Sequence, residues 1–253
     1  MPYHSDRPSI FRINVPDEHN TATKTKMMSP PTTLGKNAMS YLTLLLNIIE
    51  SNDWNTFEQV ALQNPKAFQS LASIISTTSE FNGMSFLHAI VRYNPPLDII
   101  AKIVELCPDS PRCCDCLNRT PLHVAAGSGA SASTIKFLAM AHPDACKIQD
   151  EDGRTPLHFA CDTESQLFED DGSGKRDPPT YEVVHALLSA SLETAQMEDA
   201  DDMSPLEYAI FSGADMKVIR LMQKAAQKYM KKKASVERNN GGDTENTTNN
   251  AAA

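Results

Sequence analysis

Apolar residues recur at intervals of three and four along the middle of the chain, in short segments that polar turns separate. One segment carries Ile99, Ile100 and Ile103, and segments 133–141 and 181–190 repeat the pattern. This spacing places the apolar side chains on one face of an α-helix, the face that packs against a neighbour. The pattern therefore predicts an all-α protein built from short helices.

A four-residue phrase marks the start of each helical unit. Thr-Pro-Leu-His begins at residue 120 and returns at residue 155, 35 positions later. Degenerate copies, Ser-Phe-Leu-His and Ser-Pro-Leu-Glu, begin at residues 85 and 204. Repetition at this kind of period is typical of stacked helical units rather than of one globular core. The chain is therefore expected to present a repeated surface rather than a single catalytic pocket.

The unit that begins at residue 115 shows how the residues dictate the helices. Thr120 can cap the first helix with its hydroxyl, and Pro121 suits the first helical position, where its missing N–H is not needed. Gly-Ser-Gly at 127–129 ends that helix, and Pro143 stops the second helix, 133–141. In the next unit Gly153 supplies the positive φ of a turn cheaply. Each unit is thus a turn followed by two antiparallel helices.

This plan resembles the ankyrin repeat, which has a period of about 33 residues and a Thr-Pro-Leu-His-x-Ala signature. Thr-Pro-Leu-His-Val-Ala-Ala at 120–126 and Thr-Pro-Leu-His-Phe-Ala-Cys at 155–161 carry the likeness, which covers residues 81–229. The resemblance implies an all-α fold, a short ankyrin-repeat solenoid. The expected divisions are a disordered N-terminal tail 1–37, a helical cap 38–80, ankyrin repeats 81–231 and a disordered C-terminal tail 232–253.

Within 81–231 the expected units are 81–114, 115–149, 150–198 and 199–231. The cap is expected to contain two helices, 38–50 and 54–63. The third unit is longer, because its phrase lies 49 residues before the next one, which leaves 14 extra residues (49 − 35). They fall between its two helices, and the stretch 163–179 has the composition of a loop. Insertion there costs little chain entropy, so we expect an exposed loop at the end opposite the turns.

Charge is unevenly spread along the chain. Residues 115–213 carry 18 acidic and 6 basic residues, a balance of −12, within a total of −9. Residues 214–253 carry 8 basic and 4 acidic residues, a balance of +4. An acidic body repels phosphates, so a basic protein partner is expected and a nucleic acid is not. The basic tail is interpreted as a solvated helix end, as an address or phosphorylation signal at Ser235, or as a region that folds back on the acidic body.

The sequence gives no sign of a membrane segment. No apolar run approaches the roughly 20 residues that a spanning helix needs, and the N-terminus lacks the apolar stretch of a signal peptide. The expected location is therefore inside the cell, in the cytoplasm or the nucleus, without membrane contact.

The histidines and cysteines are the candidate chemical groups. His88, His123 and His158 stand at one place in the repeated phrase, and the ankyrin resemblance implies that each imidazole bonds backbone near the turn and ties units together. The four cysteines of segment 107–116 are too closely spaced for the two separated ligand pairs of a structural zinc site, which favours small apolar fillers. A metal- or redox-responsive role for Cys107–Cys116 stays an alternative.

Resemblance to ankyrin proteins implies binding by the turn tips and by the first helices, which line a concave surface. Large apolar groups at non-core positions would supply binding energy, and acidic tips beside them would reject acidic ligands. The expected partner-binding residues are Phe81, Met84, Arg92, Tyr93, Leu117, Arg119, Glu151, Asp152, Arg154, Asp201, Met203 and Phe211.

The predicted function is a non-catalytic, monomeric protein-interaction module that holds a basic or basic-apolar segment of another protein and needs no cofactor. Neither a nucleophile elbow nor a phosphate-binding glycine loop is present in the sequence. The alternative from the enzyme class is a substrate adaptor or a regulatory subunit of an enzyme on another chain.

Overall fold

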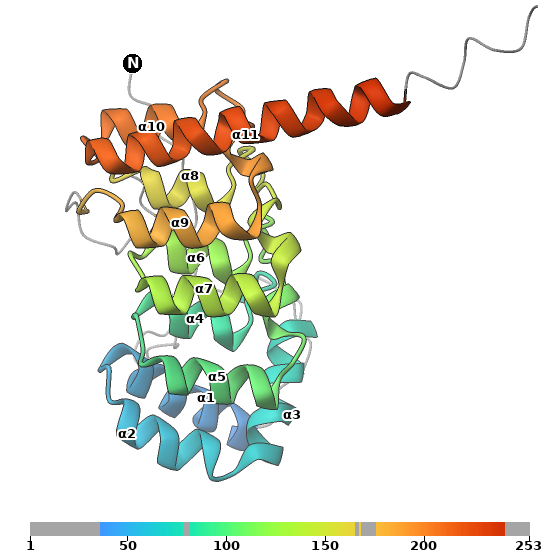
Figure 1. Cartoon of the computed structure of the whole chain (residues 1–253). Helices are drawn as coiled ribbons and strands as arrows, with labels where there is room; N and C mark the ends of the chain where they lie inside the picture. Colours follow the sequence, from blue (N-terminus) through green and yellow to red (C-terminus); the bar gives the residue numbers. More distant parts are fainter. Residues whose placement is uncertain (1–35, 78–80, 165–166, 168–175, 241–253) are drawn as a thin grey trace, which may run out of the picture.

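The computed structural model describes residues 36–77, 81–164, 167 and 176–240. Within these residues every regular element is helical, and the elements stack as successive helical hairpins (Figure 1). The all-α solenoid expected from the sequence is therefore confirmed. Residues 1–35 and 241–253, which hold most of the two expected tails, lie outside the described residues.

The cap contains one helix more than the sequence indicated. It consists of α1 (Lys36–Glu50), α2 (Trp54–Phe57), the π-helical turn η1 (Glu58–Leu62) and α3 (Pro65–Thr77). Proline suits the start of α3 because the first helical N–H needs no partner. The apolar residues of α3 then follow at helical spacing, and Phe68 stacks on Phe86 of the first repeat with ring centroids 5.0 Å apart.

The four units follow as pairs of helices. They are α4 (Phe86–Arg92) with α5 (Leu97–Leu106), α6 (Pro121–Gly127) with α7 (Ala132–Ala141), α8 (Pro156–Cys161) with α9 (Tyr181–Ala190), and α10 (Pro205–Phe211) with α11 (Met216–Asn240). Short 3-10 turns, η3 (Ser110–Arg112), η4 (Pro143–Cys146) and η5 (Glu193–Gln196), follow the second helices of the first three units.

The helices form two rows. The inner row contains the first helix of each unit, α4, α6, α8 and α10, and the outer row contains α5, α7, α9 and α11 (Figure 1). One continuous apolar core runs between the rows, with Ile100, Leu122 and Ile135 at most 1% exposed. Burial of each such side chain contributes about 1.5–3 kcal/mol. Each unit therefore depends on its neighbours to cover its apolar faces.

The last helix is longer than the repeat requires. Residues 232–240 were expected to belong to a disordered tail, but α11 continues to Asn240. That expectation was wrong because lysine, alanine, glutamate and arginine, which fill much of this stretch, are good helix formers even without a core to pack on. The end of α11 projects beyond the stack (Figure 1).

Candidate functional site: the turn tips and the inner helix ends

Aspartate organises each turn between units. Oδ1 of Asp115 accepts hydrogen bonds from the backbone N–H of Leu117 (3.0 Å) and of Arg119 (2.8 Å). Asp150 and Asp199 repeat the arrangement in the next two turns. A carboxylate that accepts from two backbone N–H groups satisfies donors that a turn would otherwise leave without a partner. The acidic residue that opens each turn is therefore structural, while the residues after it form the tip.

Backbone hydrogen bonds join the tips into a ladder. The N–H of Glu151 donates to the carbonyl of Leu117 (3.0 Å), and the N–H of Ala200 donates to the carbonyl of Asp152 (2.9 Å). Gly153 lies in this ladder with φ +77°, and a Cβ there would lie 2.9 Å from the nitrogen of Ala200. The close approach of one turn to the next thus requires glycine at this position.

Three buried histidines connect successive units. The Nδ1 atom of His123 accepts from the backbone N–H of Thr120 (3.0 Å), so the proton resides on Nε2. Nε2 lies 3.0 Å from the carbonyl oxygen of Ile148 and 3.2 Å from that of Arg154, both outside its own helix. His88 and His158 make the equivalent contacts one unit earlier and one unit later. The structural role expected for these residues is confirmed.

Burial also keeps the three imidazole rings neutral. Desolvation lowers the pKa of His123 to about 3, although two carbonyl hydrogen bonds oppose the shift. The pKa of His88 and that of His158 fall to about 4 for the same reason. All three side chains are 0% exposed. They are neutral near pH 7 and out of contact with solvent, which does not suit a general base acting on a ligand.

The final unit keeps the capping box at the start of its inner helix, but within the described residues its capping side chain makes no bond to a following turn. Oε2 of Glu207 accepts from the backbone N–H and the hydroxyl of Ser204, both at 2.7 Å. Glutamate at this place completes the reciprocal capping box that histidine completes in the other units. A carboxylate has no N–H to donate onward to a following turn. The departure of the sequence from the repeated phrase therefore coincides with the end of the stack.

Two of the residues expected to bind a partner are buried, so that expectation was wrong for them. Met84 is 4% exposed and belongs to the core, and Arg119 is 2% exposed. The guanidinium of Arg119 pairs with Asp115, with Nη2 2.7 Å and Nε 2.8 Å from Oδ2. Its Nη1 donates to the carbonyl of Leu167 (3.1 Å), a residue of the inserted segment. Arg119 is therefore a structural residue that the insert covers.

The described residues of the insert pack on the inner helices, which the sequence did not indicate. Leu167 is 5% exposed, and a Cβ on Gly127 would lie 2.5 Å from its Cδ1. The guanidinium of Arg176 donates to the carbonyls of Ala126 (3.4 Å) and Phe159 (3.2 Å) at the ends of α6 and α8. The expectation of an exposed loop is thus wrong for Leu167. The remaining residues, 165–166 and 168–175, lie outside the described part of the chain.

The guanidinium of Arg154 makes ion pairs and hydrogen bonds within the protein. Nη1 pairs with Asp162 (3.1 Å), Nη2 donates to the hydroxyl of Tyr208 (2.9 Å), and the guanidinium lies over the Tyr208 ring. The hydroxyl of Tyr208 in turn donates to Asp199 (2.7 Å). Burial and this hydrogen bond raise the pKa of Tyr208 well above its ordinary value. The cluster fastens the third unit to the fourth.

The structure divides the other expected residues into two groups. The turn-tip group, which precedes the inner helices, contains Phe81, Leu117, Glu151, Asp152, Asp201 and Met203. The helix-end group lies at the opposite ends of α4 and α10 and contains Arg92, Tyr93 and Phe211. Arg92 lies over the Tyr93 ring at 5.4 Å, and Phe211 is 75% exposed. An inner helix of seven residues separates the groups by about 10 Å.

Two exposed apolar residues beside Phe211 were not predicted from the sequence. Ile210 is 54% exposed and Met216 is 60% exposed. Ile210 occupies the place in the phrase that Ala126 occupies in the second unit, where the residue is 3% exposed. Aligning the repeated phrases could have identified Ile210, because a neighbouring unit covers this position in the second unit and α10 belongs to the last unit.

The cysteine cluster shows no metal-binding arrangement within the described residues. In the described part of the chain, no group of three histidine, cysteine, aspartate or glutamate side chains is arranged to hold a metal ion. Burial is the main cause that raises the pKa of each of the thiols of Cys107, Cys113, Cys114 and Cys116. A raised pKa lowers the fraction of reactive thiolate. The metal- or redox-responsive alternative therefore gains no support.

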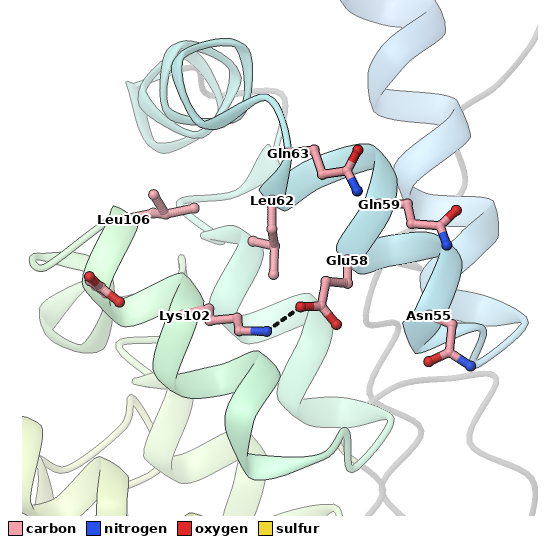
Figure 2. Close-up of a pocket in the computed structure, with 8 residues that line it drawn as sticks. Asn55, Glu58, Gln59, Leu62, Gln63, Lys102 and Leu106 are labelled. Atoms are coloured by element: carbon pink, nitrogen blue, oxygen red, sulfur yellow. Dashed lines mark hydrogen bonds and ion pairs between the residues drawn. The ribbon is translucent and has the colours of Figure 1, made fainter.

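A polar cleft of about 680 Å³ lies between the cap and α5 (Figure 2). The amide side chains of Asn55, Gln59 and Gln63 line the cap side, and Lys102 forms an ion pair with Glu58 across the cleft. Both partners of the pair are partly exposed, so solvent screens their attraction.

The fold and this surface define a solenoid of helical hairpins whose tips and helix ends are open to a partner. Residues 87–169 match the family model described as ankyrin repeats (3 copies), so this part of the chain consists of ankyrin repeats. The unit formed by α10 and α11 follows the matched segment and keeps its capping box. A comparison with curated proteins gave no match. None of the helices in the described residues has the length and apolar character needed to cross a bilayer.

Proposed function

We propose that this chain binds an extended segment of another protein that carries basic and apolar side chains. Ankyrin repeats generally mediate protein–protein interaction and are typically non-catalytic. The turn tips and the inner helix ends would form the binding surface, the concave face of the family. The observation that carries the proposal is the exposure of acidic tips and of Phe211 on elements that hydrogen bonds hold in place.

Charge supports the basic character of the ligand. The side chains of Glu151 and Asp201 are exposed on neighbouring tips, and within the described residues neither forms an ion pair. Unpaired carboxylates attract basic ligands and reject acidic ones, which determines selectivity more than affinity.

One exposed and one half-buried aromatic side chain support the apolar character of the ligand. Phe211 and Tyr93 stand at the ends of two inner helices, and large aromatic side chains commonly supply most of the binding energy of an interface. Between these two helices, the buried Leu167 packs on Gly127 at the end of α6. A ligand would therefore contact the first and the last helix of the inner row, α4 and α10, rather than α6 and α8 between them.

A displayed library of random 16-residue peptides tests the proposal against purified protein. We expect wild type to select peptides rich in lysine, arginine and large apolar residues. Phe211→Ser and the pair Glu151→Lys/Asp201→Lys should each reduce binding of selected peptides about tenfold or more. Met140→Ser is the matched control, because Met140 is 71% exposed on the outer row. Selection of acidic peptides, or equal binding by all variants, would contradict the proposal.

A further inference from the structure

The final helix carries a continuous basic stripe. α11 contains eight basic residues and one acidic residue over its 25 positions. Six of the basic residues follow one another at intervals of three, four or seven, so they lie on one side of the helix. The stripe consists of Lys217, Arg220, Lys224, Lys228, Lys231 and Arg238, all exposed. Within the described residues none of these side chains forms a salt bridge.

The second half of α11 leaves the body of the protein. Val218, Met222 and Ala225 pack into the core, and the hydroxyl of Tyr229 lies 3.4 Å from Glu193. Beyond that contact, residues 230–240, here called the arm, project past the stack (Figure 1). At 1.5 Å per residue the arm is about 16 Å long. Met230 and Val236 on it are each 51% exposed.

The arm has no means of turning back onto its own acidic tips. α11 contains neither proline nor glycine, the usual origins of a sharp kink, and it is one uninterrupted helix. The basic tail therefore points away from the body whose charge it complements. A surface of matching charge must come from another molecule.

The molecule itself presents such a surface. Glu151, Glu198, Asp201 and Asp202 are exposed on two neighbouring turns, and within the described residues none of the four forms an ion pair. Helices that pack side by side are 8–10 Å apart, so two neighbouring tips span about 10 Å. A basic arm of about 16 Å is long enough to cover both tips.

We infer that the arm docks on the turn tips of a second copy of this chain. Two copies related by a two-fold axis would exchange arms, which closes the assembly as a dimer. This differs from the monomer expected from the sequence, and it goes beyond the proposed function. Because the arm and a basic ligand would use the same tips, self-association would compete with partner binding.

Sedimentation equilibrium of the full chain at about 20 mM and about 500 mM NaCl tests the inference. Higher salt shortens the screening length to a few ångströms, so we expect the dissociation constant of the dimer to rise at least tenfold. Three reversals on α11, Lys228→Glu/Lys231→Glu/Arg238→Glu, should make the chain monomeric at low salt. Three reversals on the tips, Glu151→Lys/Glu198→Lys/Asp201→Lys, should do the same.

A variant that carries both sets of reversals distinguishes specific pairing of the arm with the tips from a general effect of net charge. A chain with both sets of reversals restores opposite charges at the interface, so it should dimerise again at low salt. The matched control, Lys66→Glu/Arg112→Glu/Lys136→Glu, removes the same charge from exposed sites elsewhere and should remain dimeric. A monomeric wild type at low salt would overturn the inference, even if its arm bound duplex DNA or anionic vesicles. A combined variant that stays monomeric while its circular dichroism matches wild type would also overturn it.

Discussion

Nε2 of His123 lies 3.2 Å from the backbone carbonyl oxygen of Arg154, 31 residues further along the chain. The same ring accepts the N–H of Thr120 on its other nitrogen, so one neutral imidazole caps its own helix and holds the next turn. The repeated histidine therefore couples two neighbouring units through a single side chain. This coupling makes the stability of one unit depend on the next.

Removal of this side chain should destabilise the whole stack. His123→Ala leaves the N–H of Thr120 and the carbonyls of Ile148 and Arg154 without their partner in a buried region. Each unsatisfied buried group costs about 1–3 kcal/mol, so we expect a loss of about 3 kcal/mol or more. Urea denaturation followed by circular dichroism measures it. His185→Ala, on the exposed face of α9, should change stability by less than about 0.5 kcal/mol.

Stability should fall as the pH drops below about 6.5. The unfolded chain binds protons on its histidines near that pH, whereas His88 and His158 have a pKa of about 4 in the fold and His123 of about 3. Each histidine protonated only in the unfolded state lowers stability by up to about 1.4 kcal/mol per pH unit. Between pH 6 and pH 4 the three together give a slope of up to roughly 4 kcal/mol per unit.

Urea unfolding at pH 7.5, 6 and 5 measures this slope. His123→Gln removes one of the three groups and should reduce the slope by about a third. A free energy of unfolding that stays constant from pH 7.5 to pH 5 would contradict the neutral, buried state of these rings.

Substitution of the glycine in the third turn should disturb the ladder of tips. Gly153→Ala places a Cβ at φ +77° and 2.9 Å from the nitrogen of Ala200. Strain and steric contact together should cost about 2–3 kcal/mol, measured as a lower melting temperature. Gly129→Ala is the matched control, because its φ is +71° but no atom lies within 4 Å of the added Cβ. It should cost about 1 kcal/mol, and equal effects would refute the importance of the close approach.

The insert should contribute to stability through Leu167. Leu167→Ala removes a side chain that packs on Gly127 and opens a path for water to the buried pair of Arg119 and Asp115. We expect a loss of about 2–3 kcal/mol in thermal or urea unfolding. Leu97→Ala truncates the same side chain at a site that is 37% exposed. If both variants lost equally little, the contact of Leu167 with the inner helices would be unimportant.

The repeat itself could be predicted from the sequence, because its signals are local. Thr120 followed by Pro121 specifies the start of a helix, and the spacing of Ile99, Ile100 and Ile103 specifies which face is buried. The change from His158 to Glu207 marks the last unit for the same reason. Each of these features is found within one helix or by comparing copies of the same phrase, so a single sequence is enough to find them.

Tertiary structure alone decided which of the candidate site residues are open. Arg119 stands at a turn tip in the sequence, but Leu167, 48 residues away, covers it, and no local pattern connects the two. Likewise residues from 232 onward indicated a tail, and only the continuous α11 shows that residues 230–240 form a straight arm that projects past the stack. Exposure and direction depend on contacts between distant segments, and a local pattern contains no information about those contacts.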